Sequence, residues 1–242
     1  MSIWIKICAN TSLADALLAV EAGVPADRSL SAGWDAGADA VGFVFAPSPR
    51  RVTAAQVAAI VPHLPATVEK IGVFVDAALE EIVSTVQACG LTGVQLHFDA
   101  EPELPARLHE RLGPELRILR VIHFNEQSAA RHAAQLAEHS QNPHVDAVLV
   151  DSRTASAVGG TGVTFDWAAA RTTLFQNAEA QEVKTRLIAA GGLNPDNVAE
   201  AIAALSPWGV DAASGVEAAP GRKDPAKVRE FISRARTKNS TS

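Results

Sequence analysis

The first hydrophobic pattern in the chain alternates with a period of two. In residues 3–8 the odd positions are isoleucine, whereas Trp4, Lys6 and Cys8 occupy the even positions. Side chains of a strand point alternately to its two faces, so the three even residues share one face. The pattern therefore predicts a strand that turns a lysine and a cysteine to the same side near its end.

Residues 40–45 form a nearly continuous apolar run, as expected for a strand buried on both faces of a parallel sheet. Six further strands are predicted at residues 70–75, 93–97, 116–122, 147–151, 187–190 and 209–212. A helical pattern follows every strand, over about 12–23, 53–63, 78–88, 102–112 and 125–139, near 165–167, from Asn194-Pro195, and from Asp224-Pro225. Eight strand-helix units predict an α/β fold, a single (β/α)₈ TIM barrel with eight parallel strands.

An open doubly wound sheet is the main competing fold. It is disfavoured because the first strand-helix turn, residues 8–11, lacks the glycine fingerprint of dinucleotide binding. We expect one barrel domain over residues 1–237, with an inserted loop near 24–36 and a disordered tail at 238–242.

Composition narrows the class of partner and the compartment. The net charge of -6 argues against nucleic acid or an anionic membrane as the main partner. The N-terminus does not have the pattern of a signal peptide, and the sequence contains no uninterrupted apolar run long enough for a membrane span. Cys8 and Cys89 are the only cysteines and form no disulfide framework. We expect a cytoplasmic protein that binds a small molecule.

Two loops at neighbouring strand ends are candidates for phosphate binding. The seventh strand leads into Gly191 and Gly192, and the eighth leads into Ser214 and Gly215. Glycines let backbone N–H groups approach an anion, and barrels often build phosphate sites from these two loops. A plain turn is the alternative reading of the glycine pair alone.

Other strand ends carry groups capable of acid-base chemistry. Asp151 closes the sixth strand, where a carboxylate must face a cavity or a partner; a cap or loop anchor is equally compatible. Cys8 has the ordinary alternative of core packing, although Lys6 on the same face favours its ionisation. Arg50, in a loop with prolines, is a surface cation or a carboxylate clamp. His97 and Asp211 also lie at strand ends, whereas the helix histidines His63, His109, His132 and His139 are expected on the surface.

A series of motifs runs through nearly the whole chain in the order found in one enzyme family. They are Lys6-Ile7-Cys8, Gly42-Phe43-Val44-Phe45, Ser48-Pro49-Arg50, Gly72-Val73-Phe74-Val75, Gln95-Leu96-His97, Asp151, Gly159-Gly160-Thr161-Gly162, Phe165-Asp166-Trp167, Gly191-Gly192-Leu193-Asn194-Pro195, Asp211, Ser214-Gly215-Val216-Glu217 and Pro220-Gly221. In these motifs the sequence resembles the phosphoribosylanthranilate isomerases.

The resemblance implies an Amadori rearrangement in tryptophan biosynthesis. The substrate would be N-(5-phosphoribosyl)anthranilate and the product 1-(2-carboxyphenylamino)-1-deoxyribulose 5-phosphate, with no metal and no organic cofactor. It implies that Asp151 is the general acid and Cys8 the general base. Arg50 would meet the anthranilate carboxylate. Lys6, His97 and Asp211 are further substrate-binding candidates, and the glycine loops would hold the phosphate.

Three positions depart from the family pattern. Ala9 and Phe98 stand where glycine is common, and Ala213 replaces a serine beside the phosphate loop. Ala9 is the change expected to matter most, because it follows Cys8. We expect Ala213 to remove at most one hydroxyl contact.

Two other functions remain open from the residues. One is a metal-dependent sugar-phosphate epimerase that uses His97, His123, Asp151 and Asp211 as ligands. The other is a phosphosugar-binding barrel without turnover, because fold alone does not establish catalysis. A monomer and a homodimer are both compatible with the sequence.

Overall fold

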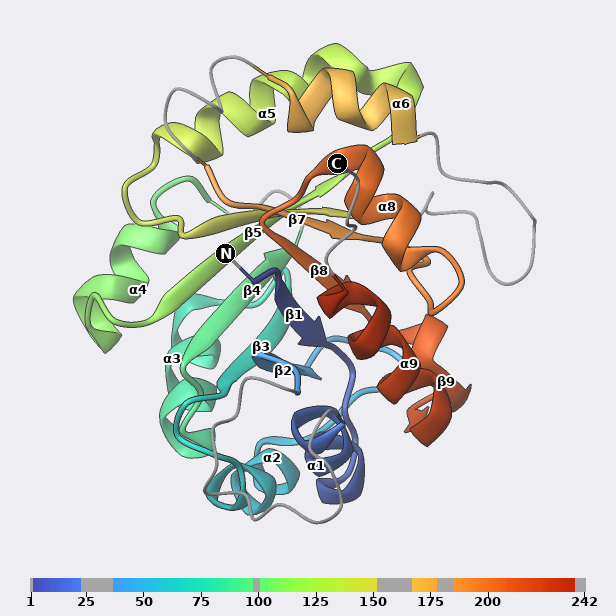
Figure 1. The fold of residues 1–242 in the computed structure, drawn as a ribbon. Helices are drawn as coiled ribbons and strands as arrows, with labels where there is room; N and C mark the ends of the chain where they lie inside the picture. Colours follow the sequence, from blue (N-terminus) through green and yellow to red (C-terminus); the bar gives the residue numbers. More distant parts are fainter. Residues whose placement is uncertain (1, 23–36, 98–100, 152–166, 178–184, 238–242) are drawn as a thin grey trace.

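Eight parallel strands close into a barrel in the computed structural model, which describes residues 2–22, 37–97, 101–151, 167–177 and 185–237 (Figure 1). Each strand pairs with its neighbours in chain order, and β1 also pairs with β8. The strands are β1 (Trp4–Ile7), β2 (Ala40–Val44), β3 (Glu69–Val75), β4 (Gly93–His97), β5 (Arg117–His123), β6 (Ala147–Asp151), β7 (Leu187–Ala190) and β8 (Gly209–Ala212). The predicted (β/α)₈ barrel is confirmed.

The alternation in β1 separates the two layers of the core. Ile5 and Ile7 face outward and belong to the large apolar layer between the strands and the helices. Trp4 faces inward with Ile71, Leu119 and other small or branched side chains of the barrel interior. The prediction that the even positions of β1 share a face is confirmed, so the Lys6 side chain lies inside the barrel.

Helices surround the barrel (Figure 1). Their bounds are α1 (Leu13–Glu21), α2 (Ala54–Ile60), α3 (Leu79–Cys89), α4 (Leu104–Leu112), α5 (Ala129–Gln141), α6 (Trp167–Ala170), α8 (Val198–Leu205) and α9 (Pro225–Arg236). Three local signals fix ends as predicted: Thr53 and Gln56 form a capping box before α2, Gly90 ends α3 in the left-handed region, and Asp224 caps α9. Short non-α turns extend α2, precede α5 and follow α6.

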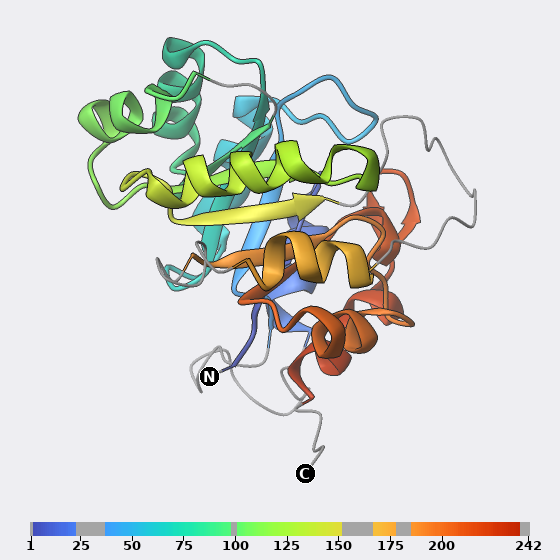
Figure 2. The same ribbon diagram turned by 90° about the horizontal axis from the view of Figure 1, so that it is seen from above.

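Two sequence expectations about helices are wrong. Helix α8 begins at Val198, not at Pro195, because Asn194 caps a preceding turn in which its side-chain oxygen accepts a hydrogen bond from the Asp196 N–H. His132 and His139 are buried, not on the surface. They are among the buried residues of α5, and this helix packs against β5 and β6. Figure 2 shows the helix lying along the barrel.

One element after β8 is absent from the predicted series. Residues Ser214–Val216 form a 3₁₀ turn, after which β9 (Glu217–Ala219) and β10 (Arg222–Lys223) make a small antiparallel hairpin. The Lys223 N–H donates to the Asp15 carboxylate on α1 at 3.0 Å. The hairpin is thereby tied to the first helix beside the end of β1.

Several predicted features lie outside the described residues. They are the 24–36 insertion, Gly23, Phe98, the loop with Gly159-Gly160-Thr161-Gly162, Phe165-Asp166 and the 238–242 tail. Among the described helices, none is both long and apolar enough to cross a membrane.

Candidate active site

Lys6 lies inside the barrel with a set of polar partners. Its side chain is fully buried, and its Nζ lies 3.0 Å from Asp211 Oδ1 on the neighbouring strand β8. It also donates a 2.8 Å hydrogen bond to Gln95 Oε1 on β4. A buried ammonium group needs such partners, because desolvation of an isolated charge is very costly. Lys6 is therefore held in a fixed position one layer below the barrel mouth.

Cys8 is presented by a tight turn directly after β1. Its N–H donates to the Ala212 carbonyl at 2.8 Å, and Ala9 then adopts a φ of 63°. That left-handed backbone favours glycine and costs an alanine about 1 kcal/mol. Asn10 stabilises the turn by donating from its backbone and its side chain to the Gly42 carbonyl, at 2.9 and 3.2 Å. Ala9 therefore retains a glycine-like turn despite departing from the family pattern.

The packing around Cys8 leaves no room for a side chain at position 42. A Cβ added to Gly42 would lie 2.6 Å from Cys8 Sγ and 3.1 Å from Lys6 Cε. The cysteine and the lysine thus share one crowded face, as the sequence predicts.

Burial dominates the ionisation of the thiol. Burial raises the pKa of Cys8, and Asp211 raises it further, while Lys6 and Lys223 oppose them without cancelling them. Lys6 lowers the pKa of Cys8, as the sequence predicts, but burial and Asp211 together raise this pKa by more. For Lys6 itself burial acts to lower the pKa, yet Asp211 and Cys8 outweigh burial and raise it, so the ammonium form is retained.

Asp151 is the last residue of β6, and its side chain is buried. It shares the inward face with Ala147 and Leu149, two residues of the apolar barrel interior. Strands β6 and β1 are separated around the barrel by β7 and β8, and all four end at the same side. Cys8 and Asp151 therefore stand at different points around one barrel mouth.

A row of directed hydrogen bonds runs from Lys6 toward β5. Because Gln95 Oε1 accepts from Lys6, its Nε2 group donates to His97 Nε2 at 2.8 Å. That nitrogen must then be unprotonated, so the proton of a neutral His97 is on Nδ1 and is donated to His123 Nε2 at 3.3 Å. Lys6 thus orients the Gln95 amide, whose N–H group faces Nε2 of His97.

Arg50 is held by a carboxylate that the sequence did not single out as a site residue. Its Nε and Nη2 groups donate to Glu217 at 2.7–3.0 Å, and Lys223 Nζ lies 3.4 Å from the same carboxylate. Burial acts to raise the pKa of Glu217, but hydrogen bonds from Arg50 and the charge of Lys223 outweigh it, and the pKa falls below its ordinary value. Burial lowers the pKa of Lys223 more than its anionic neighbours raise it.

The sequence signals explain why Glu217 and Lys223 were not predicted as site residues. Glu217 was visible only as a charged residue directly after the predicted phosphate loop. Lys223 gave no signal, because a lysine between turn residues ordinarily lies in solvent.

The two glycine loops lie against each other. A Cβ on Gly215 would lie 2.0 Å from the Leu193 carbonyl oxygen, so only glycine fits this contact. Gly192 has a φ of 72° and open space around it. Within the described part of the chain, no acceptor meets the backbone N–H groups of Gly192, Ser214 or Gly215. This arrangement is compatible with the phosphate site that the sequence predicts.

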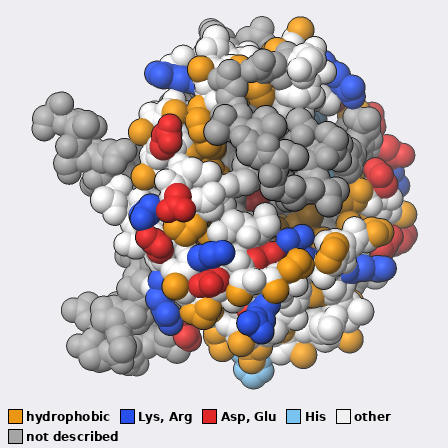
Figure 3. Space-filling view, turned by 90° about the vertical axis from the view of Figure 1, so that its right-hand side faces the viewer, with side chains coloured by type: hydrophobic (Ala, Val, Ile, Leu, Met, Phe, Trp, Pro, Cys, Tyr) orange, Lys and Arg blue, Asp and Glu red, His pale blue; other side chains and the backbone are white. Residues whose placement is uncertain are grey.

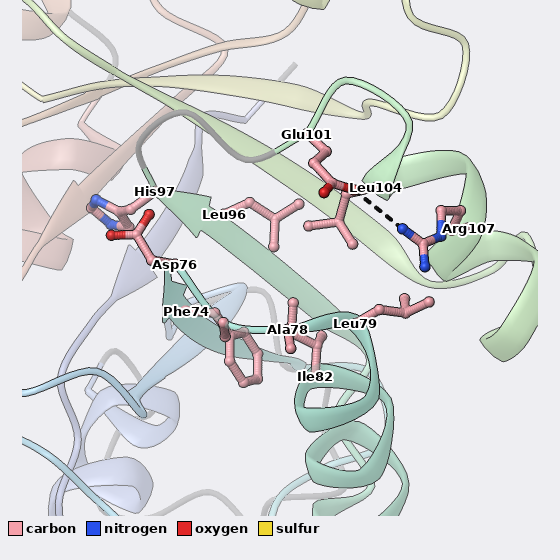
Figure 4. Close-up of a pocket in the computed structure, with 11 residues that line it drawn as sticks. Phe74, Asp76, Ala78, Leu79, Ile82, Leu96, His97, Glu101, Leu104 and Arg107 are labelled. Atoms are coloured by element: carbon pink, nitrogen blue, oxygen red, sulfur yellow. Dashed lines mark hydrogen bonds and ion pairs between the residues drawn. The ribbon is translucent and has the colours of Figure 1, made fainter.

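One cavity lies between α3 and α4, next to the end of β4 (Figure 4). It has a volume of about 440 Å³. Figure 4 shows Asp76 and His97 near one end, the Glu101–Arg107 ion pair at the other, and an apolar floor between them. Of the predicted site residues, only His97 lines this cavity. We therefore place the candidate site in the barrel mouth and not in this cavity.

Figure 3 views the side toward which the strand arrows of Figure 1 point. Cationic and anionic side chains are interspersed there. Within the described ranges, no three His, Cys, Asp or Glu residues are grouped so that they could hold a metal ion. His97 pairs with His123 while Asp211 pairs with Lys6, so the four residues of the epimerase alternative do not form one ligand set.

Comparison with known proteins gives one consistent result. A family model described as N-(5'phosphoribosyl)anthranilate (PRA) isomerase matches residues 5–234. The N-(5'-phosphoribosyl)anthranilate isomerase of Pelobacter propionicus is 42% identical over 241 residues, covering 99% of both chains. That of Geotalea uraniireducens is 39% identical over 233 residues, covering 96% of this chain and 98% of its own.

Solved structures agree with the sequence relatives. The isomerase from Thermotoga maritima superposes with a TM-score of 0.77 at 33% identity, covering 96% of this chain and 98% of its own. A phosphoribosyl anthranilate isomerase in complex with reduced 1-(o-carboxyphenylamino)-1-deoxyribulose 5-phosphate gives a TM-score of 0.74 at 31% identity, with the same coverage. With the barrel, the mouth and the nearly full-length matches together, the chain belongs to the N-(5'-phosphoribosyl)anthranilate isomerase family.

Proposed function

We propose that this protein converts N-(5'-phosphoribosyl)anthranilate to 1-(2-carboxyphenylamino)-1-deoxyribulose 5-phosphate. The observation that carries the proposal is the presence of a buried thiol and a buried carboxyl group at one barrel mouth, beside a pair of glycine loops with available N–H groups. The family match over residues 5–234 supports the same reaction.

In the proposed chemistry Asp151 and Cys8 act on successive steps. Asp151 donates a proton to the ribose ring oxygen, so that the ring opens and an iminium cation forms at C1. Cys8 then removes the proton from C2, which the adjacent cation has made more acidic. The enolamine that results tautomerises to the aminoketone product. A proton donor and a base are sufficient for this sequence, and no cofactor is needed. Proton exchange with solvent then returns Asp151 and Cys8 to their starting protonation states.

The remaining site residues would bind the two charged ends of the substrate. The N–H groups of Gly192, Ser214 and Gly215, together with the Gly191 turn, would hold the phosphate. Arg50 would meet the anthranilate carboxylate. Lys6 and Asp211 are buried, so we assign them an indirect contribution through Cys8, while His97 forms part of the wall of the mouth.

The proposal is tested by following the loss of fluorescence of freshly made phosphoribosylanthranilate, with and without chelator. Turnover is expected in both. Cys8→Ser and Asp151→Asn should each reduce kcat by at least about a thousandfold, since each removes an acid-base group. Cys89→Ser is the matched control, because Cys89 is a buried cysteine of α3 and should leave kcat unchanged.

Binding separates a catalytic role from a structural one. Both inactive variants should still bind the reduced product analogue and should unfold as cooperatively as the parent protein. Substantial turnover in either variant would refute its assigned role. Absence of turnover in the parent protein, with analogue binding retained, would instead favour the non-catalytic barrel.

We further propose a cytoplasmic location, supported by two buried, unpaired cysteines. The expected partner is a small phosphoribosyl substrate. One related isomerase, from Thermotoga maritima, is dimeric. Both the monomer and the homodimer remain predictions for this chain.

A further inference from the structure

The guanidinium group of Arg50 is bound along only one of its edges. Glu217 accepts from Nε at 2.9 Å and from Nη2 at 2.7 Å, a two-point contact that fixes the plane of the guanidinium. Nη1 has no hydrogen-bond partner among the described residues, and the side chain is 22% exposed. The edge formed by Nη1 and the second Nη2 proton is therefore left for an external carboxylate.

The carboxylate that orients Arg50 is itself firmly anchored. The Glu217 side chain is only 4% exposed, and it also accepts from the Gly221 N–H at 3.3 Å. The Gly221 carbonyl in turn accepts a hydrogen bond from Thr11 Oγ1 at 2.5 Å. Glu217 thus connects Arg50 to a hairpin that is fastened to the segment following β1.

Glu217 alone would neutralise the charge of Arg50 and weaken its attraction for an anion. Lys223 prevents this, because its fully buried ammonium group lies 3.4 Å from the same carboxylate. The three groups together carry a formal net charge of +1. Lys223 Nζ also donates to the Ala213 carbonyl at 3.2 Å, so this second cation is fixed as well.

We propose that Glu217 is a positioning residue that sets which edge of Arg50 faces the substrate, with Lys223 preserving the net positive charge. The group recognised is the aryl carboxylate ortho to the amine, so this cluster determines specificity for the anthranilate moiety. The inference rests on the proposed function, because it takes the carboxylate-bearing arylamine as the substrate.

The test compares two ligands in a calorimeter. One is reduced 1-(o-carboxyphenylamino)-1-deoxyribulose 5-phosphate, and the other is the same molecule without the ortho carboxylate. Glu217→Gln should weaken binding of the first ligand about ten- to hundredfold, because the single amide oxygen cannot replace the two carboxylate oxygens that accept from Nε and Nη2 of Arg50. The second ligand should lose less than about threefold. Arg50→Met should show the same selectivity, and the double variant should be no weaker than Arg50→Met alone.

A matched control is Glu80→Gln, which removes an exposed ion pair between Glu80 of α3 and Arg111 of α4, on the helices outside the barrel, and should change neither affinity. Equal weakening of both ligands by Glu217→Gln would overturn the proposal, since it would indicate general damage to the site. A carboxylate-selective loss in Arg50→Met but not in Glu217→Gln would also overturn it.

Lys223→Met provides an independent check if Glu217→Gln does not fold. It should weaken the carboxylate ligand selectively, and the proposal fails if both ligands are affected alike. Failure of the proposed function has a different signature: the parent protein would neither turn over phosphoribosylanthranilate nor distinguish the two ligands. A higher KM with little change in kcat for Glu217→Gln would agree with the binding result.

Discussion

Replacing His139 with leucine should remove one source of acid sensitivity from this protein. His139 is a buried residue of α5 and lines a cavity of about 360 Å³ together with Arg120 of β5. Burial, together with the positive charge of Arg120, lowers its pKa from 6.5 to about 4. The His139 ring therefore stays neutral in the folded protein, whereas in the unfolded chain it takes up a proton near pH 6.5.

The sign and the size of the effect follow from proton linkage. Because the unfolded state binds more protons between pH 6.5 and about 4, the free energy of unfolding falls as the pH falls through this range. The difference between the two pKa values corresponds to about 3 kcal/mol in total. About 2 kcal/mol of this loss is expected by pH 5.

Urea unfolding at pH 7, 6 and 5 measures the effect. The parent protein should lose about 2 kcal/mol more than His139→Leu between pH 7 and pH 5, since carboxylates common to both proteins cancel in the difference. His63→Leu is the control, because the exposed His63 should leave the pH dependence unchanged. Equal losses in the parent and in His139→Leu would refute the assignment of a neutral, buried His139.

Two shorter predictions concern Cys8. Gly42→Ala should fold but reduce kcat by about tenfold or more, because its Cβ must displace Cys8 Sγ from 2.6 Å; steady-state rates within twofold of the parent would contradict this. Since burial holds the pKa of Cys8 above its ordinary value, the rate at which a small alkylating reagent modifies Cys8 in the Cys89→Ser variant should rise about tenfold per pH unit between pH 7 and 9, because only the thiolate reacts. A rate that is flat across this range would show that the thiol is already ionised.

The barrel could be predicted because its strands and most helix ends depend on local signals. Alternation in residues 3–8 separated Lys6 from Ile5, and the cap residues before α2 and α9 marked where those helices begin. The burial of His139 was not predictable in this way. It depends on the packing of α5 against β5 and β6, which brings His139 to the same cavity as Arg120. Nothing in the sequence of α5 indicates which strands it packs against.

The candidate site was predictable only where a residue's place on a strand decides where its side chain lies. The positions of Asp151 and Cys8 at the barrel mouth follow from strand ends and alternation, whereas their roles were inferred from the family resemblance. The Arg50–Glu217 contact joins residues 167 positions apart, through a hairpin whose strands are only two and three residues long. Periodicity cannot detect an element so short, so neither Glu217 nor Lys223 could be placed beside Arg50 from the sequence.

The inward-facing side chains along β1 explain how a charged group can be buried below the barrel mouth while the barrel stays closed. Trp4 stacks on Trp208 at 5.1 Å between ring centroids and fills the end of the barrel away from the mouth. Lys6 stands two residues further along, about 7 Å away by strand geometry, and Cys8 stands two residues beyond that. The charged group of Lys6 therefore lies between the apolar layer at Trp4 and the thiol of Cys8 at the mouth. Lys6 is fully buried, so its charge acts on the mouth through Cys8 and through the Gln95 hydrogen bonds and not through water.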